Sequence, residues 1–256
     1  MKNDFLEKGF TKIFYVDLGI DLKRLQEKIY SLTSKLLIDH DPSIGVSKRI
    51  QLPFKQLPTN NDWSAIMNKI NDSEELKLII NSKNVISAFK EIQGSPQKFS
   101  ISTFRCRFPD QSRSLYNWHQ DEGTWYLSKN KNVQNKFPAT MWFSVNGANE
   151  NDSIQLVTGS HKKKLFDHKY VEGQGFFTAN VKEKEIDMDK IFTVKTKPSE
   201  AIMFHPLMLH RSVPYAEGVL RPRYSIDLRY YDSNSNFKFD KSYLFYLKKL
   251  YKTIFK

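Results

Sequence analysis

The stretch KFSISTFRCRFP, residues 98–109, decides the fold class that this sequence predicts. Apolar and polar residues alternate along it, which is the period of a β-strand with one buried face. Short runs of similar character follow it, and clusters of Gly, Pro or Asn separate most of them. Many short strands divided by turn residues are typical of a β-sandwich or barrel, and they argue against a parallel sheet with crossover helices.

The sequence before this stretch has mostly helical spacing, apart from a strand expected at 10–18. We expect helices at 21–38, 61–71 and 82–94, the last of them ended by Gly94. Further strands are expected at 139–148, 152–161, 175–181, 190–196, 200–209 and 221–232. The prediction is a single domain over 1–256 that is mainly β with helical additions. It divides into an N-terminal helical part (1–97) packed on one face of a catalytic core (98–232), and a C-terminal basic amphipathic helix (233–256).

The composition fits a folded protein of a reducing compartment. Of the 256 residues, 39% are hydrophobic and 14% aromatic, which argues against global disorder. Cys106 is the only cysteine, so no disulfide can form within the chain. Charges interrupt the N-terminal stretch before any signal-peptide core, and no apolar run reaches the length of a membrane span. We therefore expect a cytoplasmic protein without a transmembrane segment.

The net charge of +12 attracts anions in general. The lysines are scattered and form no arginine-rich block, which indicates a general solvated surface, so a nucleic-acid partner is not expected. One lysine-rich stretch, SKNKNVQNK at 128–136, follows the motif described next and could meet an anionic substrate or be a solvated loop.

The motif WHQDEG, residues 118–123, places His119 and Asp121 two positions apart. On a strand such residues point the same way, so an imidazole and a carboxylate could bind one ion. A third ligand would complete the two-histidine, one-carboxylate set that is typical of non-haem Fe(II) oxygenases. Zinc favours more nitrogen or sulfur ligands, and the chain has a single thiol.

The stretch PSEAIMFHPLMLHRSVP, residues 198–214, offers two candidates for that third ligand. His210 is followed by RSVP, where the strand is expected to end, which suits a ligand at a barrel mouth. His205 precedes a proline inside the apolar run, and a hydrogen-bonded core histidine is the alternative for it. We prefer His210 and keep His205 as the other candidate.

The stretch RPRYSIDLRY, residues 221–230, places Arg223 and Ser225 on one face of a strand. A guanidinium binds a carboxylate through two parallel hydrogen bonds, and a hydroxyl adds a third. This chemistry suits the distal carboxylate of 2-oxoglutarate, although a surface arginine in a salt bridge has the same appearance.

Four motifs, in order, resemble the phytanoyl-CoA dioxygenase-like branch of the Fe(II)- and 2-oxoglutarate-dependent oxygenases, over roughly residues 98–232. WHQD is similar to the family's metal-binding HQD, and SIQLVTGSHKKK to its G-x-L-x-V-x-P-G-S-H segment. EAIMFHPLMLHRSVP and RPRYSIDLRY are similar to its distal-histidine stretch and to the arginine strand that follows. The resemblance implies a double-stranded β-helix, a cupin-like jelly roll, with a metal at its open end.

The resemblance also implies cofactors and roles. Its Fe(II) ligands would be His119, Asp121 and His210. Its 2-oxoglutarate site would be made of four residues: Arg223, Ser212, Trp142 and Ser225. His161 matches a histidine whose role we expect to be structural. O2 would be the second co-substrate, and Asp121 argues against a halogenase, because halide-binding relatives lose that carboxylate.

Two departures from the family pattern affect the arginine. Tyr215 stands where an asparagine is usual, and the loop YAEGVLRP is about two residues longer than is typical. Strict spacing from His210 would make Arg221 the clamp, whereas the local R-x-S pattern selects Arg223. We prefer Arg223 and keep Arg221 as the alternative.

The function expected from these motifs is hydroxylation of an unactivated C–H bond of a small metabolite, anionic or neutral. Trp118, Trp125 and Tyr126 are candidates for the substrate pocket, with core packing as their other reading. One alternative is an oxidative nucleic-acid demethylase, since Arg223 and Arg229 have its six-residue spacing. Another is a jelly-roll module that binds metal without catalysis. The sequence leaves open whether the protein forms a homo-oligomer.

Overall fold

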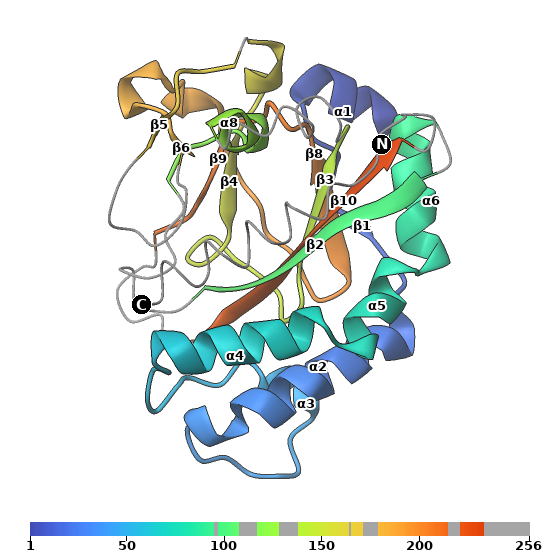
Figure 1. Cartoon of the computed structure of the whole chain (residues 1–256), viewed down its shortest axis with the longest axis vertical. Coiled ribbons are helices and arrows are strands. Elements are labelled where there is room, and N and C mark those ends of the chain that lie inside the picture. Colours follow the sequence, from blue (N-terminus) through green and yellow to red (C-terminus); the bar gives the residue numbers. More distant parts are fainter. Residues whose placement is uncertain are drawn as a thin grey trace.

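The computed structural model of this chain describes residues 1–94, 97–107, 117–127, 138–163, 165–170, 179–214 and 221–232. Its centre is a pair of antiparallel sheets with helices beside them (Figure 1). The larger sheet has the strand order β1-β8-β3-β10-β2. Its strands are β1 (Phe14–Tyr15), β2 (Gln97–Arg107), β3 (Thr140–Ser144), β8 (Glu200–Phe204) and β10 (Arg223–Asp232).

The smaller sheet has the order β7-β4-β9, and a separate pair is formed by β5 and β6. These strands are β4 (Ile154–Val157), β5 (Lys169–Tyr170), β6 (Ala179–Asn180), β7 (Ile191–Thr193) and β9 (His210–Ser212). Four single turns of 3-10 helix lie at Ser34–Leu36, Ser160–Lys162, Glu183–Glu185 and Met188–Lys190.

Six helices precede the first long strand. They are α1 (Lys2–Lys8), α2 (Gly19–Thr33), α3 (Val46–Arg49), α4 (Asn60–Asn71), α5 (Glu74–Ile80) and α6 (Lys83–Gln93). Thr59 caps the N-terminus of α4, where its hydroxyl accepts a hydrogen bond from the amide of Asp62. Ser73 caps α5 in the same way, by accepting from the amide of Leu76. Gly94 ends α6 in the left-handed conformation (φ 75°), as its sequence predicts.

The alternation of β10 gives the larger sheet two different faces. Tyr224, Ile226 and Leu228 are fully buried in the core that this sheet shares with α2, α4, α5 and α6. These helices lie along one side of the sheet in Figure 1. Arg223 and Ser225 belong to the opposite face and line a pocket with residues of β4 and β9. The helical side therefore supports the sheet, and the polar side is left for chemistry.

The predicted fold class and the predicted packing of helices on one face agree with this architecture, whereas the bounds of several helices and strands differ. The sheets are antiparallel and the N-terminal helices cover one face, as predicted. The strand expected at 10–18 is wrong in extent, because only Phe14–Tyr15 pairs with β8 as a strand. The helix expected at 21–38 ends at Thr33, after which the chain tightens into a 3-10 turn. The predicted helix at 233–256 lies outside the described residues.

Within the described part of the chain, no helix is long and apolar enough to cross a membrane. The division into 1–97, 98–232 and 233–256 stays a prediction.

Candidate metal and co-substrate site

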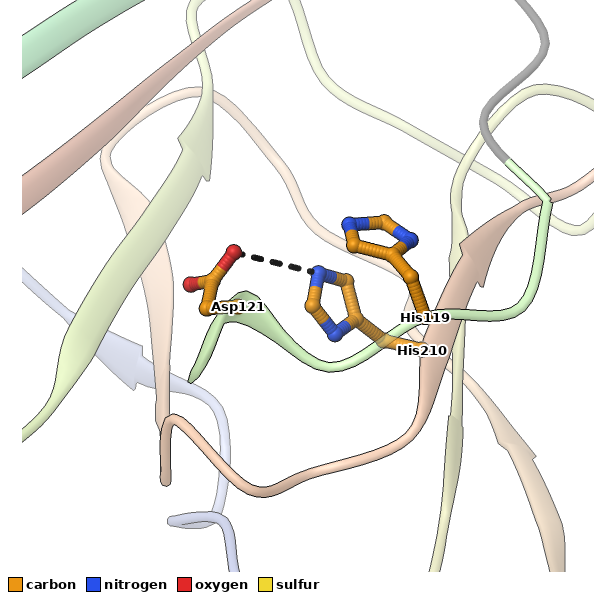
Figure 2. A group of neighbouring side chains, drawn as sticks. All are labelled: His119, Asp121 and His210. Atoms are coloured by element: carbon orange, nitrogen blue, oxygen red, sulfur yellow. Dashed lines mark ion pairs between the residues drawn. The ribbon is translucent and has the colours of Figure 1, made fainter. Parts of the chain in front are cut away.

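His119 and His210 are joined to each other through their backbones. The amide of His119 donates to the carbonyl of His210 and the amide of His210 to the carbonyl of His119, both at 2.9 Å. In such an antiparallel pair both side chains leave the same face. Their rings accordingly lie together, as Figure 2 shows. The ring centroids are 4.1 Å apart.

Asp121 comes to these rings in a way that the sequence did not predict. We expected His119 and Asp121 to share a strand, but this is wrong: His119 forms an isolated bridge, and Asp121 is the first residue of helix α8 (Asp121–Leu127). The chain turns into the helix there, and the Glu122 amide donates to the carbonyl of Pro206 (3.1 Å). The carboxylate still faces the histidines, with Asp121 Oδ1 3.8 Å from His210 Nε2 (Figure 2).

The donor atoms of the three residues suit a metal ion. One ligand atom from each of His119, Asp121 and His210 lies within 4.8 Å of the others. His119 Nδ1 lies 2.7 Å from the carbonyl of Asn117, and His210 Nδ1 lies 2.9 Å from the carbonyl of Met208. A carbonyl only accepts, so each Nδ1 carries the proton and each Nε2 keeps a lone pair. Fixing the tautomer in this way is typical of metal-binding histidines.

Burial and charge hold these groups in their metal-binding protonation states. Burial, aided by the neighbouring His210, lowers the pKa of His119 to about 3, so its ring is neutral at ordinary pH. Burial alone would raise the pKa of Asp121, but the Arg229 guanidinium together with His210 and His119 outweighs it and keeps the pKa below its usual value. The neutral imidazole of His119 and the carboxylate of Asp121 are therefore in the forms that bind a metal ion.

The second oxygen of Asp121 is held by two buried side chains. Arg229 Nη2 donates to Asp121 Oδ2 at 2.8 Å, and the Thr140 hydroxyl donates to the same oxygen at 2.7 Å. We predicted no role for Thr140 and considered Arg229 only for its six-residue spacing from Arg223. These residues are 108 and 19 positions from Asp121, and no local pattern links them to it.

Gln120, between the two predicted ligands, ties the motif to its surroundings. Its side chain is fully buried, donates to the carbonyl of Leu207 (2.7 Å) and accepts the amide of Phe166 (2.8 Å). Its own amide donates to His168 Nε2 (2.9 Å). A Cβ added to Gly123 would lie 2.2 Å from the His168 ring, so the ring packs directly on the helix. Gln120 and His168 therefore fix the segment that carries His119 and Asp121.

The residues predicted for 2-oxoglutarate line the same pocket as the three ligands. All four line it: Arg223, Ser225, Ser212 and Trp142. The Arg223 guanidinium is buried, donates to the Ser225 hydroxyl and lies 5.4 Å from the centre of the Trp142 ring. Its Nε donates to the backbone carbonyl of Asp152 (2.9 Å), which sets the direction of the guanidinium.

The two alternative residues lie elsewhere. Arg221 pairs with the side chain of Asp152 (2.6 Å) and donates to Gln51 (3.1 Å), outside the pocket. His205 packs against His161, with ring centroids 5.5 Å apart, and its Nδ1 accepts the amide of Leu207 (3.0 Å). His161 Nε2 lies 3.1 Å from the carbonyl of Leu6 in α1, a structural position.

The aromatic candidates for the substrate pocket are placed only in part. Trp118 is buried in a cluster with Val157 and Leu209, and it is not among the described residues that line the pocket. The Arg211 guanidinium lies 4.6 Å from the centre of its ring. The side chains of Trp125 and Tyr126, and the lysine-rich stretch at 128–136, lie outside the described parts of the structure.

Several solved structures resemble this chain in fold at low sequence identity. Apo ThoJ, described as a non-heme monooxygenase, is 14% identical with a TM-score of 0.59, covering 99% of this chain and 98% of that one. EvdO2 from Micromonospora carbonacea var. aurantiaca, complexed with 2-oxoglutarate, is 12% identical with a TM-score of 0.56, covering 91% and 92%. SnoN, a non-heme alpha-ketoglutarate-dependent epimerase, is 14% identical with a TM-score of 0.56, covering 91% and 82%. These likenesses confirm the predicted jelly-roll fold.

The family model "Phytanoyl-CoA dioxygenase (PhyH)" matches residues 65–217, which is more than half of the chain. No curated protein sequence matches this chain. Fold, site and family model together place the chain in the superfamily of non-haem Fe(II)- and 2-oxoglutarate-dependent oxygenases. The chain belongs to the phytanoyl-CoA dioxygenase family, which confirms the resemblance drawn from its four motifs. The cofactors are those predicted: Fe(II), 2-oxoglutarate and O2.

Proposed function

We propose that this protein is a dioxygenase that hydroxylates an unactivated C–H bond of a small, anionic metabolite. The observation that carries the proposal is the meeting of His119, Asp121 and His210 with the Arg223–Ser225 pair in one pocket. The three ligands would hold Fe(II), and Arg223 with Ser225 would bind the distal carboxylate of 2-oxoglutarate. When bound, iron and 2-oxoglutarate supply the oxidising power that O2 chemistry at a C–H bond requires.

The residues of the chain position and protect this chemistry. The backbone carbonyls of Asn117 and Met208 place the proton of each neutral ring on Nδ1 and so direct each Nε2 toward the metal. Ser212 and Trp142 form the wall beside Arg223, which would orient the co-substrate and limit water around it.

The charge of the pocket supports an anionic substrate. Five arginines and two aspartates are among its described lining residues. One of these arginines, Arg211, is also paired with Glu183 (3.4 Å), which leaves a smaller excess of positive charge. Fe(II) and the 2-oxoglutarate dianion have equal and opposite formal charges, so loading the site would not remove this excess. Arg223 and Arg107 are also direct cross-strand partners, and a bound anion would lessen the repulsion between like charges in that relationship. A carboxylate or phosphate on the substrate would supply further negative charge.

Two finer points belong to the same proposal. We place the enzyme in the cytoplasm, because its single cysteine is buried and no disulfide can form within the chain. We also infer a small-molecule substrate, since the described pocket residues form no aromatic-interleaved basic groove of the kind that binds nucleic acid strands.

The experiment is a turnover screen. Purified protein with Fe(II), ascorbate, 2-oxoglutarate and O2 is incubated with sets of carboxylates, phosphate esters and matched neutral analogues, and succinate is measured. The proposal predicts that anionic compounds raise succinate formation and gain one oxygen atom by mass spectrometry, and that His210→Ala abolishes both. Stimulation by neutral compounds alone would overturn the substrate class. The absence of succinate with iron-loaded, folded protein under every condition would overturn the enzymatic function.

A further inference from the structure

Asp121 presents its two carboxylate oxygens to different surroundings. Oδ1 is the oxygen on the side of His210, 3.8 Å from Nε2. Oδ2 accepts from Arg229 Nη2 (2.8 Å), from Arg229 Nε (3.2 Å) and from the Thr140 hydroxyl (2.7 Å). Arg229 is 6% exposed and Thr140 is fully buried, so these hydrogen bonds lie where water competes little.

The sheet itself fixes the two donors. Arg229 of β10 and Thr140 of β3 are direct cross-strand partners, and Arg229 Nε also donates to the Thr140 hydroxyl (3.0 Å). Asp227, two residues before Arg229 on the pocket face of β10, adds a second negative charge near the guanidinium and is itself paired with Arg105 (2.7 Å). The hydrogen bonds to Asp121 and Thr140, with the nearby charge of Asp227, leave Arg229 little freedom to turn away from Asp121.

The number of Asp121 oxygens that bind the metal decides how many coordination positions stay open. In an octahedral site, three protein ligands that each supply one atom leave three positions open. A bidentate 2-oxoglutarate would occupy two of them, and one would remain for O2. A carboxylate can also bind through both oxygens, and Asp121 would then occupy the position that O2 needs.

We propose that Arg229 and Thr140 are positioning residues that restrict Asp121 to a single metal-binding oxygen and so keep one coordination position open for O2. This inference rests on the metal site of the proposed function. It predicts that removal of either donor leaves the fold and the three ligands in place but allows Oδ2 to turn to the metal.

The test counts exchangeable water on bound Mn(II), by water-proton relaxation, with and without 2-oxoglutarate. Wild type is expected to keep three waters on the metal, and one after 2-oxoglutarate binds. Arg229→Met and Thr140→Val are each expected to lose one water in both states. Arg229→Lys keeps a cation and a hydrogen-bond donor, so this variant is expected to keep the same number of waters as wild type. The matched control is Arg221→Met, because Arg221 forms a similar arginine–aspartate pair away from the metal site.

The outcomes separate this proposal from the proposed function. If wild type binds no Mn(II) or Fe(II), the metal site fails and this inference fails with it. If wild type carries three waters and the folded Arg229→Met and Thr140→Val proteins carry three as well, the metal site stands and the positioning role is overturned. Circular dichroism checks folding. If Arg229→Met does not fold, Thr140→Val decides the question, because it removes one hydroxyl and keeps the shape of the side chain.

Discussion

His119 and His210 are direct backbone partners, although they are 91 positions apart in the sequence. Their reciprocal hydrogen bonds at 2.9 Å make the two rings one unit, so whatever displaces one segment displaces both ligands. Gln120 strengthens this unit, because its side chain reaches the carbonyl of Leu207 on the approach to His210. The metal centre should therefore respond to changes in the residues that hold these segments.

Gln120→Ala tests that dependence. It removes a donor and an acceptor and leaves the Leu207 carbonyl and the Phe166 amide without this partner, which costs about 1–3 kcal/mol of the free energy of unfolding. We also expect weaker Mn(II) binding by roughly tenfold or more, as is usual when the support of a metal ligand is lost. Urea unfolding and metal titration measure the two effects.

The matched control for that variant is Gln26→Ala. Gln26 is also buried and donates to the Val145 carbonyl (2.9 Å), on the helical side of the sheet. The Gln26→Ala protein should lose stability and keep its metal affinity. Equal loss of metal affinity in both variants would show that Gln120 acts only through global stability.

Gly123→Ala tests the packing of α8 on His168. The added Cβ would lie 2.2 Å from the His168 ring, which donates Nδ1 to the Phe166 carbonyl and cannot move without losing that bond. We expect a loss of about 1–3 kcal/mol, as for other overpacked sites. Gly45→Ala is the control, since nothing lies within 4 Å of its added Cβ. Thermal unfolding of the two variants should differ clearly, and equal melting temperatures would contradict the close packing.

Arg223→Met and Arg221→Met distinguish the two candidate clamps. Arg223 lines the pocket beside Ser225, whereas Arg221 is occupied by Asp152 outside it. Loss of a buried charged partner costs about 2 kcal/mol or more, which is roughly 30-fold in the Kd for 2-oxoglutarate. We expect this weakening in Arg223→Met and a much smaller change in Arg221→Met, by titration of the Mn(II) protein. The reverse order would transfer the role to Arg221.

His205 predicts a pH dependence of stability in the metal-free protein. Burial, with a contribution from His161, lowers its folded-state pKa to about 4, against about 6.5 for an unfolded histidine. Between these values the unfolded chain binds more protons, so the free energy of unfolding falls as the pH falls from about 6.5 toward 4. In His205→Gln this loss should be smaller than in wild type, by urea unfolding at pH 7.5 and pH 5. Identical losses would show that His205 is not buried in a neutral state.

The sequence predicts the parts of this site that depend on spacing. Arg223 and Ser225 share a face because β10 is a strand, and the tripeptide spacing of His119 and Asp121 brings them together even though Asp121 begins a helix. Arg229 and Thr140 escaped prediction as donors to Asp121, because their meeting depends on the register of β10 against β3. Register is a property of the folded sheet, and a single sequence shows it only indirectly.

The most direct test of the central claim is the visible charge-transfer band that Fe(II) and 2-oxoglutarate give when chelated together, recorded without O2. We predict the band in wild type and in His205→Ala, its loss in His119→Ala and His210→Ala, and a weaker band at limiting 2-oxoglutarate in Arg223→Met. Folded, iron-loaded wild type without a band, or a band that survives His210→Ala and disappears in His205→Ala, would contradict the assignment of this pocket.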